Sequence, residues 1–476
     1  MAPPSPLNLP TDSPTAPTHE PSGIKSAPET AAQQQPAASP PEPASPAESA
    51  SPPDTLESLM IQLGVITGGQ LMNDQEDAGY HPVKIGERFH DDRYQVVRKL
   101  GEGQFSMVWL AHDQQLDRHV ALKIFKSSKF FTDSAEAEIK LLERVSRANP
   151  AHPGYGHVAG LLDHFKHQGP NGSHVCLVFE PLGQSLGALI RRHKKKIPEP
   201  VVRKIGQQVL LALDYLHREC GIIHIDMKPD NVLIVVEDVE GVIRRDLEHK
   251  PKGGYDSKSS IPLSTSSSDP FHLQGQSDHD PIAVKIIDFG SATWVADRRV
   301  EGVTTRPYRS PELMLDAPWD QRIDIWSTGC MLVELLTGYL LFPAPLDLPD
   351  EHLLGMMIVL LGPFPVEVVK AGKYFHQEIA QLGKLTLFSL CTSDLVLILR
   401  KELHTLPQDL VRRQKQNQMI AKQRSQTQSL EERLLIDYPS DRSISQCILK
   451  MLQIDHTKRA QAKEILDAKG WLGSDA

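Results

Sequence analysis

The chain begins its folded part with short apolar runs of strand type and continues with longer stretches of helical period. Runs rich in Val, Trp, Leu and Ile at residues 94–100, 107–111 and 119–125 predict an antiparallel meander, with a glycine turn between the first two. Residues 135–145 have helical spacing, and residues 175–179 return to strand type. We therefore predict a small β-rich lobe that contains one helix.

Beyond this lobe the pattern becomes mainly helical. Apolar residues at i, i+4, i+7 and i+8 spacing predict a buried helix that leads into the segment around His224; they are Ile205, Val209, Ala212, Leu213 and Leu216. The sequence thus predicts an α+β fold with two lobes. Residues 80–183 form the antiparallel N-terminal lobe, and residues 184–473 form the larger, mainly α-helical C-terminal lobe.

Four segments depart from this plan. Residues 1–55 consist largely of Pro, Ala, Ser, Thr and Glu, which cannot bury enough apolar surface to offset backbone entropy, so we predict a disordered tail. Residues 56–79 are more apolar and form a linker or a docking segment. Residues 237–281 are serine-rich and predict a disordered insert. Residues 404–436 are rich in Gln, Arg, Lys and Glu, and the pattern fits both a solvated helix and an insertion without fixed structure.

Composition limits the classes of partner. The formal net charge of −9 argues against binding to nucleic acid through phosphate neutralisation. The five cysteines are scattered and lack metal-ligand spacing, which is typical of a reducing compartment. The sequence contains no stretch of about 18 apolar residues, the length that a membrane helix needs. We expect an intracellular monomer that binds neither nucleic acid directly nor membranes.

A glycine-rich turn is a candidate phosphate-binding element. Gly101 and Gly103 allow the backbone to approach phosphate oxygens closely, because no Cβ stands in the way. Such a turn by itself is more often only a turn, so its weight comes from the residues that come after it in the chain. The candidate nucleotide-binding residues around it are Leu100, Gly101, Glu102, Gly103, Gln104, Phe105, Ser106, Met107, Val108 and Ala121.

Lys123 stands near the end of a β-branched run, where its ammonium can reach the α- and β-phosphates of a nucleotide. Lysines at strand ends are usually solvated, so this interpretation again depends on context. Glu138, on the predicted helix after this strand, supplies a carboxylate to hold Lys123 in place. The neighbouring Glu136 and Glu143 are interpreted as surface charges.

The segment HIDMKPDN at residues 224–231 carries the strongest chemical signal. Asp226 is placed to accept, or at least to orient, the proton of a substrate hydroxyl, and Lys228 is placed to neutralise a transferring phosphoryl group. We interpret His224 as a packed imidazole that supports the loop. A surface loop without function is much the weaker interpretation, because D-x-K-P-x-N is a specific spacing.

Two further residues complete a metal-dependent site. Asp288 opens the triplet DFG and comes after an apolar run at residues 283–287, and Asn231 ends the earlier segment. Mg²⁺ prefers oxygen ligands, so one amide, one carboxylate and substrate phosphates suit it. The motifs together predict ATP-dependent phosphoryl transfer with Mg²⁺ held by Asn231 and Asp288.

In this order the motifs resemble a eukaryotic protein kinase over residues 80–471, apart from the two inserts at 237–281 and 404–436, and most of all an SR-protein kinase. The segments that carry the resemblance are YHPVKIGE at 80–87, FSMVW at 105–109, EIKLL at 138–142, DIWST at 324–328 and AGKY at 371–374. Two other segments, SAT at 291–293 and EHLLGMM at 351–357, resemble the neighbouring LAMMER-type kinases, which are the runner-up family.

The resemblance implies a bilobal protein-kinase fold and further roles. Phe179 would be the gatekeeper, and the backbone of Glu180 and Leu182 would hold the adenine edge. Residues 305–309 would form the loop beside the substrate residue. A pair between Glu312 and Arg459 would tie that region to the helical lobe.

One position departs from many kinases. Ile225 stands where they have an arginine that grips a phosphorylated activation loop. The sequence therefore predicts activity without phosphorylation of that loop.

The resemblance also implies the substrates, which are serines in Arg/Ser-rich proteins such as the splicing factors of mRNA processing. Asp347, Asp350 and Glu351 are candidate acids for a cationic peptide, although acids at a helix start are also favoured by its dipole. The basic residues 191–196 fit a nuclear address or a solvated helix end. We predict a serine/threonine kinase of cytoplasm and nucleus. The alternatives are a LAMMER-type kinase, a general Ser/Thr kinase and a non-catalytic scaffold.

Overall fold

The structure is a computed structural model. It describes residues 79–103, 105–193, 197–249, 282–297, 304–345, 348, 350–362, 364–372, 430 and 442–468. The predicted tail and linker, apart from residue 79, lie outside the described residues, and so does the polar segment 404–436 apart from Leu430.

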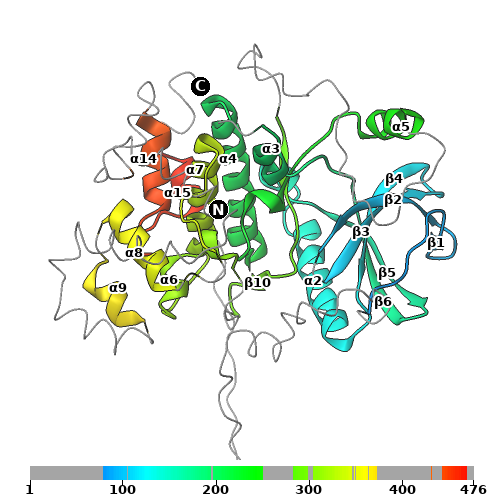
Figure 1. The fold of residues 1–476 in the computed structure, drawn as a ribbon, viewed down its shortest axis with the longest axis horizontal. Coiled ribbons are helices and arrows are strands. Elements are labelled where there is room, and N and C mark those ends of the chain that lie inside the picture. Colours follow the sequence, from blue (N-terminus) through cyan, green and yellow to red (C-terminus); the bar gives the residue numbers. More distant parts are fainter. Residues whose placement is uncertain are drawn as a thin grey trace, which may run out of the picture. The chain divides into compact units, whose positions relative to one another are not determined.

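A six-stranded antiparallel sheet forms the N-terminal lobe, with the strand order β1-β2-β3-β4-β6-β5 (Figure 1). The predicted meander is confirmed, because β2, β3 and β4 pair as consecutive neighbours. Tyr94, Val96 and Trp109 lie in an apolar cluster on one face of the sheet. The strands are β1 (Arg88–Phe89), β2 (Tyr94–Glu102), β3 (Ser106–Asp113), β4 (Arg118–Phe125), β5 (Leu161–Gly169) and β6 (Gly172–Phe179).

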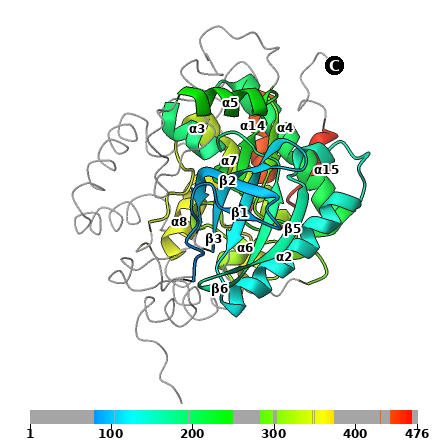
Figure 2. The ribbon, with the colours of Figure 1, turned by 90° about the vertical axis from the view of Figure 1, so that its right-hand side faces the viewer.

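The predicted helix of this lobe is α2 (Lys129–Arg147), which packs beside β4, β5 and β6 (Figure 2). Its apolar stripe buries Leu141, Leu142 and Val145 in the main core. Burial of each such side chain contributes about 1.5–3 kcal/mol, so the stripe fixes which face of the helix turns inward. Glu138 lies on this same inward-facing side of the helix.

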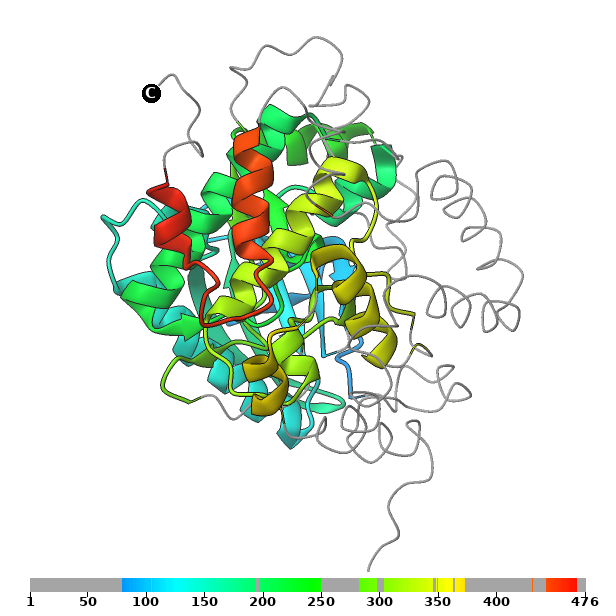
Figure 3. The same cartoon turned by 90° about the vertical axis from the view of Figure 1, so that its left-hand side faces the viewer.

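The C-terminal lobe is mainly helical, as predicted. In it α14 packs against α7, and α15 packs against α4 (Figures 1 and 3). None of the described helices is long and apolar enough to cross a membrane. The helices are α3 (Leu186–His193), α4 (Glu199–Asp214), α6 (Pro311–Met314), α7 (Arg322–Thr337), α8 (Asp350–Leu361), α9 (Val366–Ala371), α14 (Arg442–Met451) and α15 (Ala462–Leu466).

Two short strand pairs hold the loop that contains Asp226. Strand β7 (Ile222–Ile223) pairs with β10 (Thr293–Trp294), and β8 (Val232–Ile234) pairs with β9 (Val284–Ile286). The segment 224–231 runs from β7 to β8, and Asp288 lies just after β9. The pairing therefore brings two segments that are far apart in the sequence to one place.

The prediction for residues 237–281 is wrong for the N-terminal part of that segment. We expected residues 237–281 to be disordered, but the structure describes helix α5 (Val239–His249), while residues 250–281 lie outside the described part. Ile243 is buried against Leu110 of the N-terminal sheet, with Val239 and Leu247 packed beside it. Three apolar residues spaced by four form this stripe, which is enough to anchor one helical face on a sheet.

Helix α5 lies beside the N-terminal sheet (Figure 1), and polar contacts join the two. The Glu240 carboxylate accepts a hydrogen bond from the backbone N–H of His119 at 2.6 Å and pairs with its Nδ1 at 2.7 Å. Arg98, which is almost fully buried, pairs with Asp246 at 3.0 Å. A segment that comes after the loop 224–231 thus packs on β2, β3 and β4 of the other lobe.

Candidate active site

Lys123 of β4 lies between two carboxylates. Its Nζ donates to Glu138 Oε1 and Oε2 at 2.9 and 3.0 Å and to Asp288 Oδ1 at 3.0 Å. Burial alone would lower the pKa of Lys123, but Asp288 and then Glu138 raise it, so the side chain stays an ammonium. The same ammonium lowers the pKa of Asp288 to about 2. Lys123 and Asp288 therefore form an ionised pair at neutral pH.

The α2 helix presents one of its acids to this triad and the others elsewhere. Glu138 is only 2% exposed, whereas Glu136 accepts a hydrogen bond from Lys166 at 2.8 Å on the exposed face. Glu143 is also partly exposed, with His164 and Arg147 at nearly 4 Å. The helical period explains the difference, because Glu138 shares the buried face with Leu141 and Leu142.

Asp226 is the centre of a second network. Its Oδ2 accepts from Lys228 Nζ at 2.6 Å and from Asn231 Nδ2 at 3.1 Å. Its Oδ1 accepts from the backbone N–H of Thr305 at 3.2 Å and from its Oγ1 at 2.6 Å. Burial would raise the pKa of Asp226, but Lys228 and these hydrogen bonds lower it overall. The carboxylate is thus held ionised and in a fixed orientation.

Thr305 was predicted only as part of a loop beside the substrate, and its contacts are more specific than that. Its hydroxyl accepts from Lys228 Nζ at 3.0 Å while donating to Asp226. A hydroxyl oxygen therefore already lies within reach of both side chains. The sequence offered no spacing signal for this contact, because the two segments are 79 residues apart.

The residues predicted to hold a metal ion fit one. Asn231 uses its Nδ2 on the backbone oxygen and the carboxylate of Asp226, at 2.8 and 3.1 Å, which leaves its amide oxygen turned away from that aspartate. Asp288 is ionised and carries a second carboxylate oxygen besides the one on Lys123. Oxygen donors of this kind suit Mg²⁺.

The glycine-rich turn joins β2 to β3. The N–H of Gly103 donates to the carbonyl of Ser106 at 2.8 Å and closes the turn, and Tyr80 donates its hydroxyl to the Gly103 carbonyl at 2.9 Å. A Cβ at Gly101 would meet nothing within 4 Å, so its surroundings are open to a ligand. Of the predicted residues here, Gln104 lies outside the described part of the chain.

The predicted adenine-binding residues come at the end of β6. Phe179, the last residue of that strand, pairs with Ala121 of β4, so the predicted gatekeeper and Ala121 are neighbours. Glu180 and Leu182 come directly afterwards, where the chain passes from the sheet to the helices. The Glu180 carboxylate accepts from Lys285 at 2.5 Å, so its side chain points toward β9.

Sequence reasoning missed the role of Asp324, the acid on the first turn of α7. Its carboxylate is fully buried and accepts the backbone N–H groups of His224 and Ile225 at 2.9 and 2.8 Å, and it pairs with His217 Nε2 at 2.8 Å. The available signal in the sequence was an acid in the first turn of an otherwise apolar helix. Asp324 thereby fixes the backbone immediately before Asp226.

The backbone at Ile225 needs the hydrogen bond to Asp324. Its φ of 72° lies in the left-handed region, which is strained for a β-branched residue. Its side chain is buried in an apolar cluster with Ile223, Ile323 and Leu313, among others. Apolar packing thus occupies the position where many kinases place an arginine.

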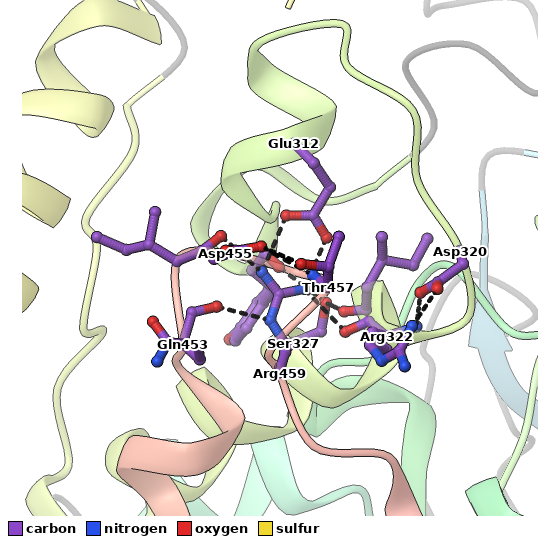
Figure 4. Close-up of polar contacts among 11 residues, drawn as sticks. Glu312, Asp320, Arg322, Ser327, Gln453, Asp455, Thr457 and Arg459 are labelled. Carbon is purple, nitrogen blue, oxygen red and sulfur yellow. Dashed lines mark hydrogen bonds and ion pairs between the residues drawn. The ribbon is translucent and has the colours of Figure 1, made fainter. Parts of the chain in front are cut away.

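The expected pair between Glu312 and Arg459 is present and fully buried (Figure 4). Two parallel hydrogen bonds of 2.6 and 2.9 Å join them, and Arg459 also donates to the carbonyls of Gln453 and Arg322. The guanidinium lies 5.0 Å from the centre of the Trp326 ring. This arrangement connects α6 with the segment between α14 and α15.

The fold and this constellation of Lys123, Glu138, Asp226, Asn231 and Asp288 define a protein kinase. The model of the protein kinase domain family matches residues 94–471. The chain is 40% identical to the serine/threonine-protein kinase SRPK of Physarum polycephalum over 64% of this chain and 76% of that protein. It is 34% identical to protein kinase dsk1 of Schizosaccharomyces pombe over 66% and 74%, and 30% identical to human SRSF protein kinase 3 over 66% and 80%.

The chain belongs to the SR-protein kinase family of serine/threonine protein kinases, which confirms the resemblance found in the sequence. Its phosphoryl donor is accordingly ATP.

Proposed function

We propose that the chain transfers the γ-phosphoryl group of Mg·ATP to serine hydroxyls in Arg/Ser-rich proteins such as splicing factors. The observation that supports this best is the contact between Asp226 and the Thr305 hydroxyl at 2.6 Å. It indicates that a hydroxyl fits against this carboxylate, with Lys228 on the other side of the same oxygen. A substrate serine would approach in the same manner.

In this proposal each side chain has one task. Asp226 orients the serine hydroxyl and takes up its proton, and Lys228 stabilises the charge that develops on the transferred group. Lys123, fixed by Glu138, holds the α- and β-phosphates. Asn231 and Asp288 would hold Mg²⁺, which when bound offsets phosphate charge. Positioning and electrostatics therefore supply most of the rate enhancement.

Preference for arginine is supported by a carboxylate beside the catalytic loop. Asp230 is about half exposed and accepts from the exposed Arg191 at 2.9 Å. A substrate arginine can replace Arg191 there, because a mobile surface ion pair contributes little free energy. Asp350, a candidate from the sequence, fits this task less well, since its carboxylate already pairs with Arg306 at 2.6 Å and lies 3.7 Å from Arg309. Asp347 lies outside the described residues.

Two matched peptides test the proposal, one with Arg-Ser and one with Lys-Ser repeats, in initial-rate measurements with Mg²⁺ and ATP. Their charge is equal, so a faster rate on the arginine peptide reports guanidinium recognition. We expect Asp230→Asn to raise KM for the arginine peptide about two- to fivefold, because an exposed ion pair contributes at most about 1 kcal/mol, while KM for ATP stays unchanged. Glu367→Gln, an exposed acid on α9, is the control.

The other outcomes are equally informative. Equal rates on both peptides would indicate a kinase of another preference. Rates no higher than those of the Asp226→Asn variant, on these peptides and on general kinase substrates, would favour a non-catalytic scaffold.

We also propose that the enzyme is active without phosphorylation of its activation loop. Ile225 offers no charge to bind a phosphate, and it packs with Val295, which comes after Asp288, and with Leu313 of α6. Apolar burial thus supplies the anchorage that an arginine–phosphate pair supplies elsewhere. We expect phosphatase-treated enzyme, verified by mass spectrometry, to keep its full kcat. Strong stimulation by an upstream kinase would contradict this.

A further inference from the structure

Three imidazoles gather where the segment before β1 crosses the β5–β6 hairpin. His167 and His174 are direct partners across the hairpin, so their side chains share one face of the sheet. The ring centre of His81 lies 4.7 Å from that of His167 and 5.3 Å from that of His174. Glu87 adds a carboxylate, whose Oε1 lies 2.7 Å from His81 Nε2. None of these residues belongs to the kinase site.

The group has the composition and the spacing of a metal site. Ligand atoms of His81, Glu87 and His167 all lie within 4.8 Å of one another, and no other such trio of His, Cys, Asp or Glu occurs in the described part of the chain. Ligands at about 2.0 Å from a tetrahedral Zn²⁺ lie roughly 3.3 Å apart. Small side-chain movements therefore suffice to surround an ion, and two imidazoles with a carboxylate are ligands that Zn²⁺ accepts.

The buried rings are not fully satisfied by the protein. His81 is 5% exposed, and its Nδ1 has no hydrogen-bond partner among the described residues. A Cβ at Gly169 would come within 2.3 Å of that nitrogen, so only glycine lets His81 lie this close to the hairpin. His174 pairs its Nδ1 with the Phe125 carbonyl, and its buried Nε2 likewise has no partner in the described chain. Each of these two rings is therefore held by a hydrogen bond at one nitrogen only.

We propose that His81, Glu87 and His167 bind one Zn²⁺ ion, with water in the fourth position. Zn²⁺ would bind His81 through Nε2, the nitrogen that faces Glu87 Oε1, with the ring proton on Nδ1, so that the imidazole stays neutral. The ion joins the segment before β1 to the β5–β6 hairpin. It is separate from the catalytic Mg²⁺ position, which offers only oxygen ligands.

The test uses the untagged full-length chain, stripped with a chelator and supplied with an excess of Mg²⁺ and a non-hydrolysable ATP analogue to fill the kinase site. Titration calorimetry with Zn²⁺ alone is expected to give one ion per chain and a higher melting temperature, because a ligand of the folded state stabilises it. We expect His167→Gln and Glu87→Gln to weaken binding more than about tenfold. Both residues are partly exposed, so the variants should fold.

His164→Gln is the matched control, since His164 is exposed on the same strand. Its Zn²⁺ affinity should equal that of the unchanged protein. Co²⁺ provides a second readout that needs no variant, because tetrahedral cobalt with nitrogen ligands has intense visible absorption bands. Absence of a Zn²⁺ isotherm and of these bands, or equal Zn²⁺ affinity in His167→Gln and Glu87→Gln, would overturn the proposal. The cluster would then be ring packing around Phe89, which lies 4.3 Å from His167 between ring centres.

Discussion

Asp226→Asn is expected to lower kcat by about 10²–10⁴-fold, the usual contribution of a positioned general base. The amide keeps the shape of the side chain but can neither take the proton of a serine hydroxyl nor pair with the Lys228 ammonium, now 2.6 Å from Oδ2. KM for ATP should change little, because Lys123 and the glycine-rich turn are untouched. Single-turnover rates with a serine peptide measure the effect.

Stability and pH provide the controls for this variant. Its melting temperature should fall somewhat, because the asparagine must turn its NH₂ toward the donors on one side, so rates are compared at a temperature where both proteins are folded. The pKa of Asp226 is lowered in the folded protein, so the ionised form, and the activity that needs it, persist above this lowered value and are lost only as pH falls through it. A kcat within tenfold of the unchanged protein would exclude Asp226 as the base.

Most of the constellation was predictable because each member lies in a local motif whose order is informative. Lys123, Glu138, Asp226 and Asp288 come from separate segments, and the structure joins them through the β4–α2 packing and the β8–β9 pair. What local sequence could not provide was contact across long separations. Thr305 contacts Asp226 although the two are 79 residues apart in the sequence, and no periodic pattern indicates such a contact.

Two other features were missed for different physical reasons. The apolar stripe of α5 has only three members, and the polar, serine-rich stretch after it dominated the composition of the window. The His81 cluster draws on the segment before β1 and on both strands of a hairpin, so no single spacing marks it. Sequence patterns report burial along one element, whereas these features depend on where separate elements meet.

Asp324→Asn tests how the catalytic loop is held, and it should reduce both stability and turnover. The buried carboxylate accepts from two backbone N–H groups and faces His217, while an asparagine must present its NH₂ to one of these partners. Each buried donor left unpaired costs about 1–3 kcal/mol, so we expect a loss of roughly that size or more in the free energy of unfolding by urea.

Turnover should fall as well, even in the fraction that stays folded at low temperature. Ile225 holds its left-handed φ of 72° against strain because Asp324 accepts its N–H, and Asp226 is the next residue. If that bond is lost, the carboxylate leaves its fixed orientation, and displacement of a reacting group by about 1 Å can cost 10²-fold in rate. The control is Asp320→Asn, which removes only a local contact with Arg322, two residues away. A stability loss without any change in kcat would mean that Asp324 supports only the packing of the lobe.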